Sequence, residues 1–236
     1  MMKMVRHLLL CLSLLSLSLS LTNCKDDKDE LDGPGVLKYE YVDLGLSVKW
    51  ATCNVGAEKP EDYGDYFAWG ETETKISYSW TNYKFRTSGD SWDNVKFSKY
   101  NTGSSYGPVD SKTVLDAGDD VAHVKWGGDW RMPTQKEFNE LRENCTWTWT
   151  TQNGVNGYQV TSNKAGYTDR SIFLPAAGYR YETNLYDAGS DGSYCWSSSL
   201  STGNPSSAWS LSFYSSIHGT GTYNRGYGQS VRPVCP

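Results

Sequence analysis

Short alternating segments of hydrophobic and polar residues run through most of the chain after Tyr39. The segment YEYVDLGLSVKWATCNVGA, residues 39–57, alternates and contains aromatic and β-branched side chains, which predicts one or two strands around a turn at Gly45. Residues 72–112 are polar and aromatic, with many Ser, Asn and Gly, and they show no long period. We expect a long loop region with short elements there.

Two helices are predicted in the middle of the chain. Asp119 or Asp120 can cap a first short helix, which the glycine pair at 127–128 would end. Thr134 and Glu137 form a T-x-x-E capping box at the start of a second helix, where each side chain bonds to the backbone N–H of the other residue. This segment carries the strongest helix signal in the sequence.

Strands are predicted from Thr146 to the C-terminus. The dipeptides at 153–154 and 156–157 are both Asn-Gly, which is a hairpin signal. The clearest alternation is in SAWSLSFYS, residues 207–215. It places Trp209, Leu211 and Phe213 on one face of a strand, toward the core, and Ser210, Ser212 and Tyr214 on the other face, toward solvent.

The last nine residues, GQSVRPVCP, close the chain as a short predicted strand. The order is therefore strands, two helices and then many short strands with long loops. This order predicts an α+β fold in a single domain, residues 39–236.

The first part of the chain has the pattern of a secretion signal. Lys3 and Arg6 are followed by a run of Leu and Ser with no charge, which at about 14 residues is too short to span a bilayer. The sequence LTNC, ending at Cys24, resembles the lipobox of bacterial lipoproteins, in which the cysteine takes a diacylglycerol and becomes the new N-terminus. We expect residues 1–23 to be a lipoprotein signal peptide and Cys24 to be lipidated; the alternative is an ordinary secretory peptide with an incidental cysteine.

Residues 24–38 form a predicted flexible, acidic tether with no apolar period. Its start, Lys25-Asp26-Asp27, resembles the surface-export signal of Bacteroidetes-type lipoproteins. The resemblance implies a lipid-anchored protein of the outer membrane that faces the cell exterior. A solvated spacer with no export role is the alternative, because charge runs are commonly that.

Composition narrows the range of partners. The formal net charge is −5 and no basic stripe occurs, so we expect no nucleic-acid partner. The chain has 10 Trp and 17 Tyr. These residues combine a large apolar body with a polar group, so they suit binding surfaces as well as cores.

Six cysteines are present, of which Cys11 would leave with the signal peptide and Cys24 would carry lipid. The others, Cys53, Cys145, Cys195 and Cys235, allow three pairings, among which their spacing does not choose. None lies in a C-x-x-C motif or near a metal-spaced histidine, so a zinc site is not expected.

Three segments resemble the FISUMP family, the major paralogous domain of surface lipoproteins. They are VDLGLSVKWATCNVGA with YGDYFAWGE, then WGGDWRMPTQKEFNEL, and finally FLPAAGYR with YCWSSS, AWSLSF and GQSVRPVC. Together they cover most of residues 40–235. The middle segment is also similar to a block of the formylglycine-generating enzyme family. Both resemblances imply a C-type lectin-like fold, in which two helices pack on small twisted sheets and the two chain ends are neighbouring strands. That neighbourhood implies a Cys53–Cys235 disulfide.

The C-terminal part also resembles the variable region of target proteins of diversity-generating retroelements, through GYR, Y-x-WSSS, AW-x-L-x-F and VRPV. Residues 178–230 are rich in Ser, Gly, Tyr, Thr and Asn, a mixture typical of paratopes. Ordinary turn residues at the end of a loop-rich domain are the alternative explanation. The resemblance implies a ligand-binding face made of Tyr181, Asn184, Tyr186, Tyr194, Ser201, Ser210, Ser212, Tyr214, His218, Tyr223, Asn224 and Tyr227.

The expected function is a cell-surface binding module that recognises an extracellular protein or glycan through this face, which the retroelement resemblance would make a diversified one. Two alternatives stay open. One is a structural surface or fimbria-associated lipoprotein without a ligand. The other is a degenerate enzyme of the formylglycine-generating type.

We expect no catalysis, cofactor or metal. The nearest match to a lectin calcium motif is Asn204-Pro205-Ser206, and no Trp-Asn-Asp accompanies it. No G-x-S-x-G sequence places a nucleophile, and no spacing favours one pair of carboxylates. Cys195 and Cys235 lie in the wrong contexts for a paired-cysteine copper site.

Overall fold

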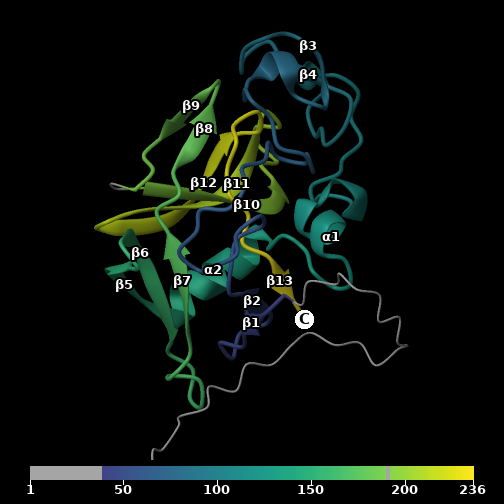
Figure 1. Cartoon of the computed structure of the whole chain (residues 1–236). Coiled ribbons are helices and arrows are strands. Elements are labelled where there is room, and N and C mark those ends of the chain that lie inside the picture. Colours follow the sequence, from purple (N-terminus) through teal and green to yellow (C-terminus); the bar gives the residue numbers. More distant parts are fainter. Residues whose placement is uncertain (1–38, 190–191) are drawn as a thin grey trace, which may run out of the picture.

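The computed structural model describes residues 39–189 and 192–236, and the signal peptide, Cys24 and the tether lie outside the described residues. Within them the fold is α+β, with two α-helices among small antiparallel sheets, as the sequence predicts (Figure 1). Strands β3 and β4 stand at the top of that view, and β1 and β2 stand toward the bottom.

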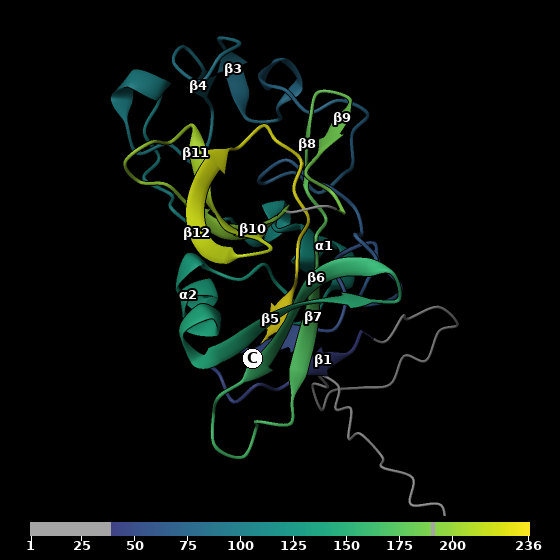
Figure 2. The ribbon, with the colours of Figure 1, turned by 90° about the vertical axis from the view of Figure 1, so that its left-hand side faces the viewer.

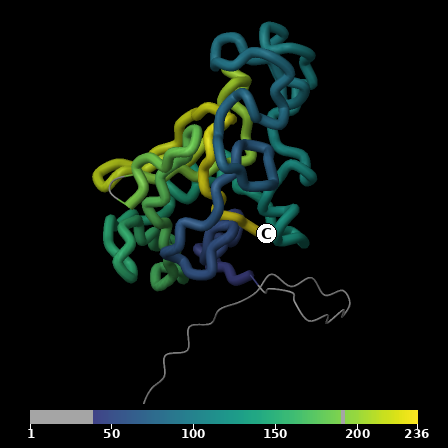
Figure 3. Tube along the Cα trace, turned by 45° about the horizontal axis from the view of Figure 1, so that its top comes forward, coloured from purple at the N-terminus to yellow at the C-terminus, as the bar shows by residue number. Residues whose placement is uncertain are grey.

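The two ends of the described chain meet in one sheet. This sheet has the order β1-β2-β13, formed by Tyr41–Val42, Lys49–Ala51 and Val234–Cys235. Trp50 pairs with Val42 on one side and Val234 on the other, and its side chain is fully buried. Figure 3 shows the yellow C-terminal end beside the purple start of the domain. The family resemblance implied that the two chain ends are neighbouring strands; the structure places them in one sheet, but β2 lies between β1 and β13.

Both predicted helices form where their caps indicate. In α1, Val121–Trp126, the Asp120 carboxylate accepts hydrogen bonds from the first turn, and Gly127 ends the helix with φ +71°. In α2, Gln135–Asn144, Thr134 and Glu137 form the capping box, with N–H to oxygen distances of 3.3 and 2.7 Å.

The sheet β5-β6-β7 shows which of the two Asn-Gly signals makes a turn. Cys145–Gln152 and Val155–Ser162 are joined at Asn153-Gly154, where both residues have positive φ, and Ser171–Pro175 pairs with the second strand. The turn predicted at 156–157 is wrong, because Gly157 lies inside β6. A Cβ there would meet the Leu174 carbonyl oxygen at 2.3 Å, so this glycine admits the backbone of β7 instead of making a turn.

The central sheet β10-β11-β12 comprises Gly192–Leu200, Ser207–Tyr214 and Ile217–Asn224. Cys195, Leu211 and Phe213 on one face join a core cluster with Phe138 and Leu141 of α2. Trp196 and Ala208 on the other face join a second cluster that is built mainly from residues 55–132. Figure 2 shows this curled sheet above α2. The sheet therefore separates two cores, and only part of it is left for solvent.

Residues 72–112 contain only short elements, as predicted. In chain order the short elements up to the first helix are η1 (Trp80–Asn82), β3 (Arg86–Ser88), β4 (Lys96–Phe97), η2 (Ser104–Tyr106) and η3 (Ala117–Asp119). Their stability comes from aromatic packing, because Tyr78, Trp80, Tyr83 and Tyr100 are buried. The hairpin of β8, Tyr179–Tyr181, and β9, Asn184–Tyr186, projects toward this region in Figures 1 and 2.

Candidate functional site

The register of the central sheet gathers tyrosines on one face. Tyr194 is paired with Ser212, and Tyr214 is paired with Gly192. Tyr223 is paired with Ala208 on the same face, because directly opposite residues of antiparallel strands point to the same side. The sequence alternation therefore identified the correct face for Ser212 and Tyr214.

Contacts between the rings extend this face onto the β8–β9 hairpin. The Tyr194 ring lies 4.9 Å from that of Tyr223 and 5.0 Å from that of Tyr179, and its hydroxyl is hydrogen-bonded to that of Tyr214. Tyr179 stacks on Tyr186 and also contacts Tyr227, which contacts Tyr181 at 5.2 Å. We call this continuous set the tyrosine face; its members are Tyr179, Tyr181, Tyr186, Tyr194, Tyr214, Tyr223 and Tyr227.

Glycines make the floor beneath the rings flat. Gly219 is opposite Ser212, and a Cβ added there would meet nothing within 4 Å. A Cβ at Gly221 would lie 3.2 Å from the Tyr223 ring, and one at Gly192 would lie 3.1 Å from the Tyr214 ring. The rings of Tyr223 and Tyr214 therefore pack directly against the backbone of Gly221 and Gly192, where a larger side chain would push them away.

Burial keeps the hydroxyl groups of Tyr179, Tyr194 and Tyr227 protonated. Burial raises the pKa of Tyr194 well above its ordinary value, and the hydrogen bond with Tyr214 raises it further. Burial also raises the pKa of Tyr179 and of Tyr227. Tyr181, Tyr186 and Tyr214 are each more than a third exposed. A ligand would thus meet apolar ring surface with phenol groups that donate and accept hydrogen bonds.

A polar pocket of about 450 Å³ adjoins the tyrosine face. Tyr181 and Tyr227 line it together with Asn224, so three residues of the predicted ligand face meet there. The remaining lining is mainly hydroxyl and carboxylate groups, from Ser77, Ser79, Thr81, Thr183, Asp90 and Glu182. We call this the hydroxyl pocket. Its size lies within the range of about 300–1,000 Å³ that is usual for ligand sites.

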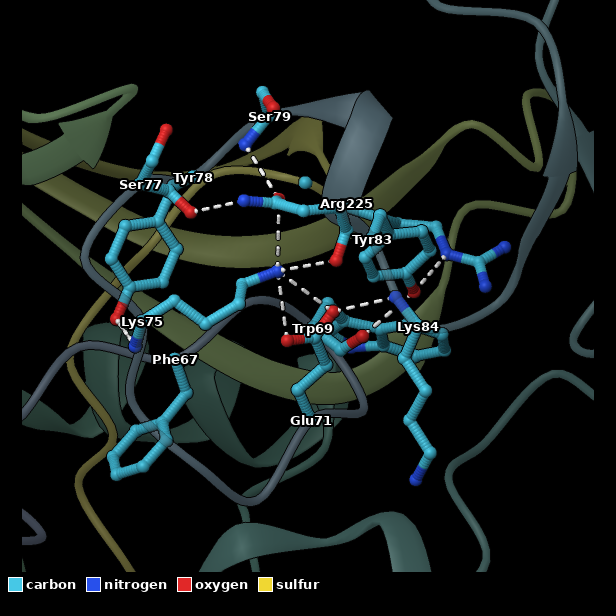
Figure 4. A network of polar contacts seen from close by, with 12 residues as sticks. Phe67, Trp69, Glu71, Lys75, Ser77, Tyr78, Ser79, Tyr83, Lys84 and Arg225 are labelled. Carbon is cyan, nitrogen blue, oxygen red and sulfur yellow. Dashed lines mark hydrogen bonds and ion pairs between the residues drawn. The ribbon is translucent and has the colours of Figure 1, made fainter.

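A hydrogen-bond network fixes the wall of the hydroxyl pocket that carries Ser77 and Ser79. The Lys75 ammonium lies 2.9 Å from the Glu71 carboxylate and donates to the Asn82 carbonyl at 3.1 Å (Figure 4). The Asn82 side chain in turn donates to the Ser77 carbonyl at 2.7 Å and accepts from the Ser79 N–H. The loop is therefore held at both of its serines.

Arg225 anchors the same region to the core. Its fully buried guanidinium donates to the Tyr83 hydroxyl at 3.0 Å and to the carbonyls of Tyr100 and Pro205 at 2.9 and 2.8 Å. It also lies 4.3 Å from the centre of the Phe97 ring. Burial lowers the pKa of the guanidinium. Because Arg225 follows Asn224 directly, this anchor positions one end of the hydroxyl pocket.

Three residues predicted for the ligand face do not belong to it. Ser210 is on the correct face of the sheet but has no exposed surface, because Gln229 and its neighbours cover it; its hydroxyl lies 2.6 Å from Gln229 Oε1. Ser201 is buried in the loop after β10. His218 is on the opposite face, where it stacks on Trp147 at 4.3 Å. Ser210 and Ser201 are therefore not surface contacts, and His218 lies away from the tyrosine face. Tyr194, also predicted as a ligand contact, is buried and packs beneath the exposed rings.

Two further predicted contacts, Asn184 and Asn224, lie near the tyrosine face, whereas Trp209 differs from its prediction. Asn184 is exposed beside Tyr186, and Asn224 accepts a hydrogen bond from the Gly226 N–H. Trp209, expected in the core, is only partly buried. Sequence reasoning missed Tyr179, which is central to the ring contacts, and the pocket wall at residues 77–90, which has no periodic signal to find.

The implied Cys53–Cys235 disulfide is not formed. Cys53 carries a free thiol and is only partly buried, and Cys145 and Cys195 are free as well. The 2.8 Å hydrogen bond from Arg232 to the Asn54 side chain and those to the Ala51 and Thr52 carbonyls join the chain ends here instead. No group of His, Cys, Asp and Glu that could hold a metal ion occurs among the described residues.

Comparison with family models, with curated proteins and with solved structures found no match for this chain. Within residues 39–189 and 192–236, no helix has the length and apolar character needed to cross a membrane.

Proposed function

We propose that this chain is a binding module that recognises an extracellular protein or glycan through the tyrosine face and the hydroxyl pocket. The observation that carries the proposal is the continuous contact of seven tyrosine rings, six from strands β8 to β12 and one from the loop at Tyr227, beside a polar pocket of about 450 Å³. Tyrosines give large contact area with few rotatable bonds, so little entropy is lost when a ligand binds.

The proposed fold type is C-type lectin-like, as in the FISUMP family. Two α-helices among small antiparallel sheets and the pairing of β13 with β2 support it. In this proposal the core clusters form a fixed framework, and the tyrosine face is the part that determines specificity.

The proposed location is the outer surface of the outer membrane, through a lipid on Cys24. The sequence of residues 21–27 supports it. Mass spectrometry of the mature N-terminus tests the lipid, and Cys24→Ser should release the protein into the soluble fraction. Replacement of Lys25, Asp26 and Asp27 by Ala should protect the protein from protease added to intact cells; unchanged digestion would refute the export signal.

A screen of the full chain against glycans and extracellular proteins tests the binding function. Tyr181→Ala and Tyr214→Ala should each weaken a captured ligand, whereas Thr222→Ala should not, since Thr222 is exposed on the opposite face of β12. Equal binding by all three variants would place the ligand elsewhere and refute the tyrosine face as the site.

Diversification of this face is a separate proposal, supported by the resemblance of the C-terminal region. Codons 178–232 sequenced across sister isolates should vary at exposed positions such as Tyr181 and Tyr214. Buried Ser210 and Trp196 should stay fixed, because each bonds to the framework. A uniform sequence across isolates would mean a fixed binding module.

A further inference from the structure

Strand β8 directs two consecutive side chains into different pockets. Successive side chains of a strand point to opposite sides, and here Tyr181 lines the hydroxyl pocket while Arg180 lines a second pocket, also of about 450 Å³. Thr183, in the β8–β9 turn, lines both pockets. The turn is therefore a partition between them. We call the second one the Arg180 pocket; its other lining includes Asp65, Tyr66, Lys75 and Tyr78.

Arg180 is held in place but its donors are unused. Its backbone N–H donates to the Gly228 carbonyl at 2.7 Å, and its carbonyl accepts from Gly228 at 2.9 Å. Its guanidinium carbon lies 4.9 Å from the centre of the Tyr66 ring. The Tyr66 hydroxyl donates to the Ala177 carbonyl, which fixes the ring beneath it. The backbone and the ring thus orient a guanidinium that presents its N–H groups to the pocket.

Every other arginine in the described part of the chain donates at least one side-chain hydrogen bond. These residues are Arg86, Arg131, Arg142, Arg170, Arg225 and Arg232. The Arg180 guanidinium makes no hydrogen bond or ion pair with any described residue. A guanidinium on an aromatic ring at the wall of a concave site has the geometry that recognises a carboxylate through two parallel hydrogen bonds.

No other charged side chain near Arg180 forms an ion pair with it. The Lys75 ammonium instead forms an ion pair with the Glu71 carboxylate at 2.9 Å. Asp65 also lines the pocket, but it forms no ion pair with Arg180. Arg180 is therefore the cation of this pocket that no described carboxylate neutralises by direct contact, and Asp65 is an unpaired carboxylate in the same lining. Across the partition, Asp90 and Glu182 line the hydroxyl pocket without any cation among its lining residues.

We propose that the Arg180 pocket is an anion subsite that binds the carboxylate of an acidic sugar, and that the adjoining sugar lies in the hydroxyl pocket. This inference rests on the proposed function and names its ligand class. A glycan is favoured over a peptide because the second pocket is lined by serine, threonine and asparagine groups and carboxylates, which pair with sugar hydroxyls, beside tyrosine rings that pack on a sugar face.

The test is titration of the full chain, by calorimetry or NMR, with two matched disaccharides that differ only in a terminal glucuronic acid or glucose. The acidic disaccharide should bind about tenfold more tightly at low salt, and added salt should reduce that preference. Arg180→Gln should abolish the preference and leave the neutral disaccharide unchanged. Tyr181→Ala should weaken both. Circular dichroism confirms that each variant is folded.

The outcomes separate this inference from the function beneath it. If Tyr181→Ala weakens binding but Arg180→Gln preserves the preference for the acid, the anion subsite is refuted and the binding face stands. If an acidic peptide binds through Arg180 and neither disaccharide does, the ligand class is wrong. If neither disaccharide binds and no captured ligand depends on Tyr181, the proposed function itself fails.

Discussion

Ser210 and Ser212 form a matched pair that tests how the central sheet is covered. Both are in β11 and both point to the same face, but Ser210 has no exposed surface and Ser212 is partly exposed. The Ser210 hydroxyl lies 2.6 Å from Gln229 Oε1 and 3.0 Å from the Cys195 carbonyl oxygen. The Ser212 hydroxyl accepts one hydrogen bond, from Tyr223 at 3.0 Å.

Replacing each serine by alanine should have unequal effects on stability. Ser210→Ala leaves the Gln229 amide oxygen buried without its partner, and the nitrogen of that amide is already unpaired, so we expect a loss of about 2 kcal/mol. Ser212→Ala should change the free energy of unfolding by less than about 0.5 kcal/mol, because water can replace the lost hydroxyl next to the partly exposed Tyr223.

Urea unfolding followed by tryptophan fluorescence measures both variants. With a slope of about 2 kcal/mol per molar urea, Ser210→Ala should lower the midpoint by about 1 M, while Ser212→Ala should leave it nearly unchanged. The pair controls for the effect of removing a hydroxyl from a strand. Equal midpoints would show that Ser210 is accessible to water, and the assignment of Gln229 as its cover would be wrong.

Three further changes test other parts of the structure. Arg225→Met should cost about 3 kcal/mol in urea unfolding, because it leaves the Tyr100 and Pro205 carbonyls buried and unpaired; a loss below about 1 kcal/mol would refute its role as an anchor. Burial and the charge of Arg142 lower the pKa of His218 below 6.5, so the unfolded chain binds the proton more readily and stability should fall as pH drops through 6.5. His218→Gln should flatten that part of the stability curve, measured as urea midpoints from pH 7.5 to 5; an unchanged slope would contradict this. Gly157→Ala should lower the melting temperature, at a cost of about 1–3 kcal/mol from the contact with Leu174, whereas Gly154→Ala has open space and suffers only from its positive φ.

Local signals in the sequence predicted local structure correctly. The capping box at Thr134 and the turn at Asn153 are each complete within a few residues, so no distant contact overrides them. The second Asn-Gly signal failed because Gly157 is required for the approach of β7, a contact between segments that the local pattern does not contain.

From the sequence, the candidate site could be predicted only within a single strand. Alternation gives the face of β11 to which Ser210 points, but not that Gln229 covers it. The wall at Ser77 and Ser79 depends on a network through Lys75 that joins residues without any regular spacing. The unused donors of Arg180 become visible only when the partners of every other arginine are known.

The position of the chain ends has a mechanical consequence. In Figures 1 and 2, β1 lies at one end of the molecule and the β8–β9 hairpin at the other. With a lipid on Cys24, residues 25–38 can reach about 50 Å from the membrane at full extension. A ligand pulled by fluid flow would then load the whole length of the molecule. The tension would enter near β1, where the Tyr41–Ala51 and Val42–Trp50 pairs and the 3.0 Å hydrogen bond from the Thr52 N–H to the Glu40 carbonyl would be among the first contacts to bear the load.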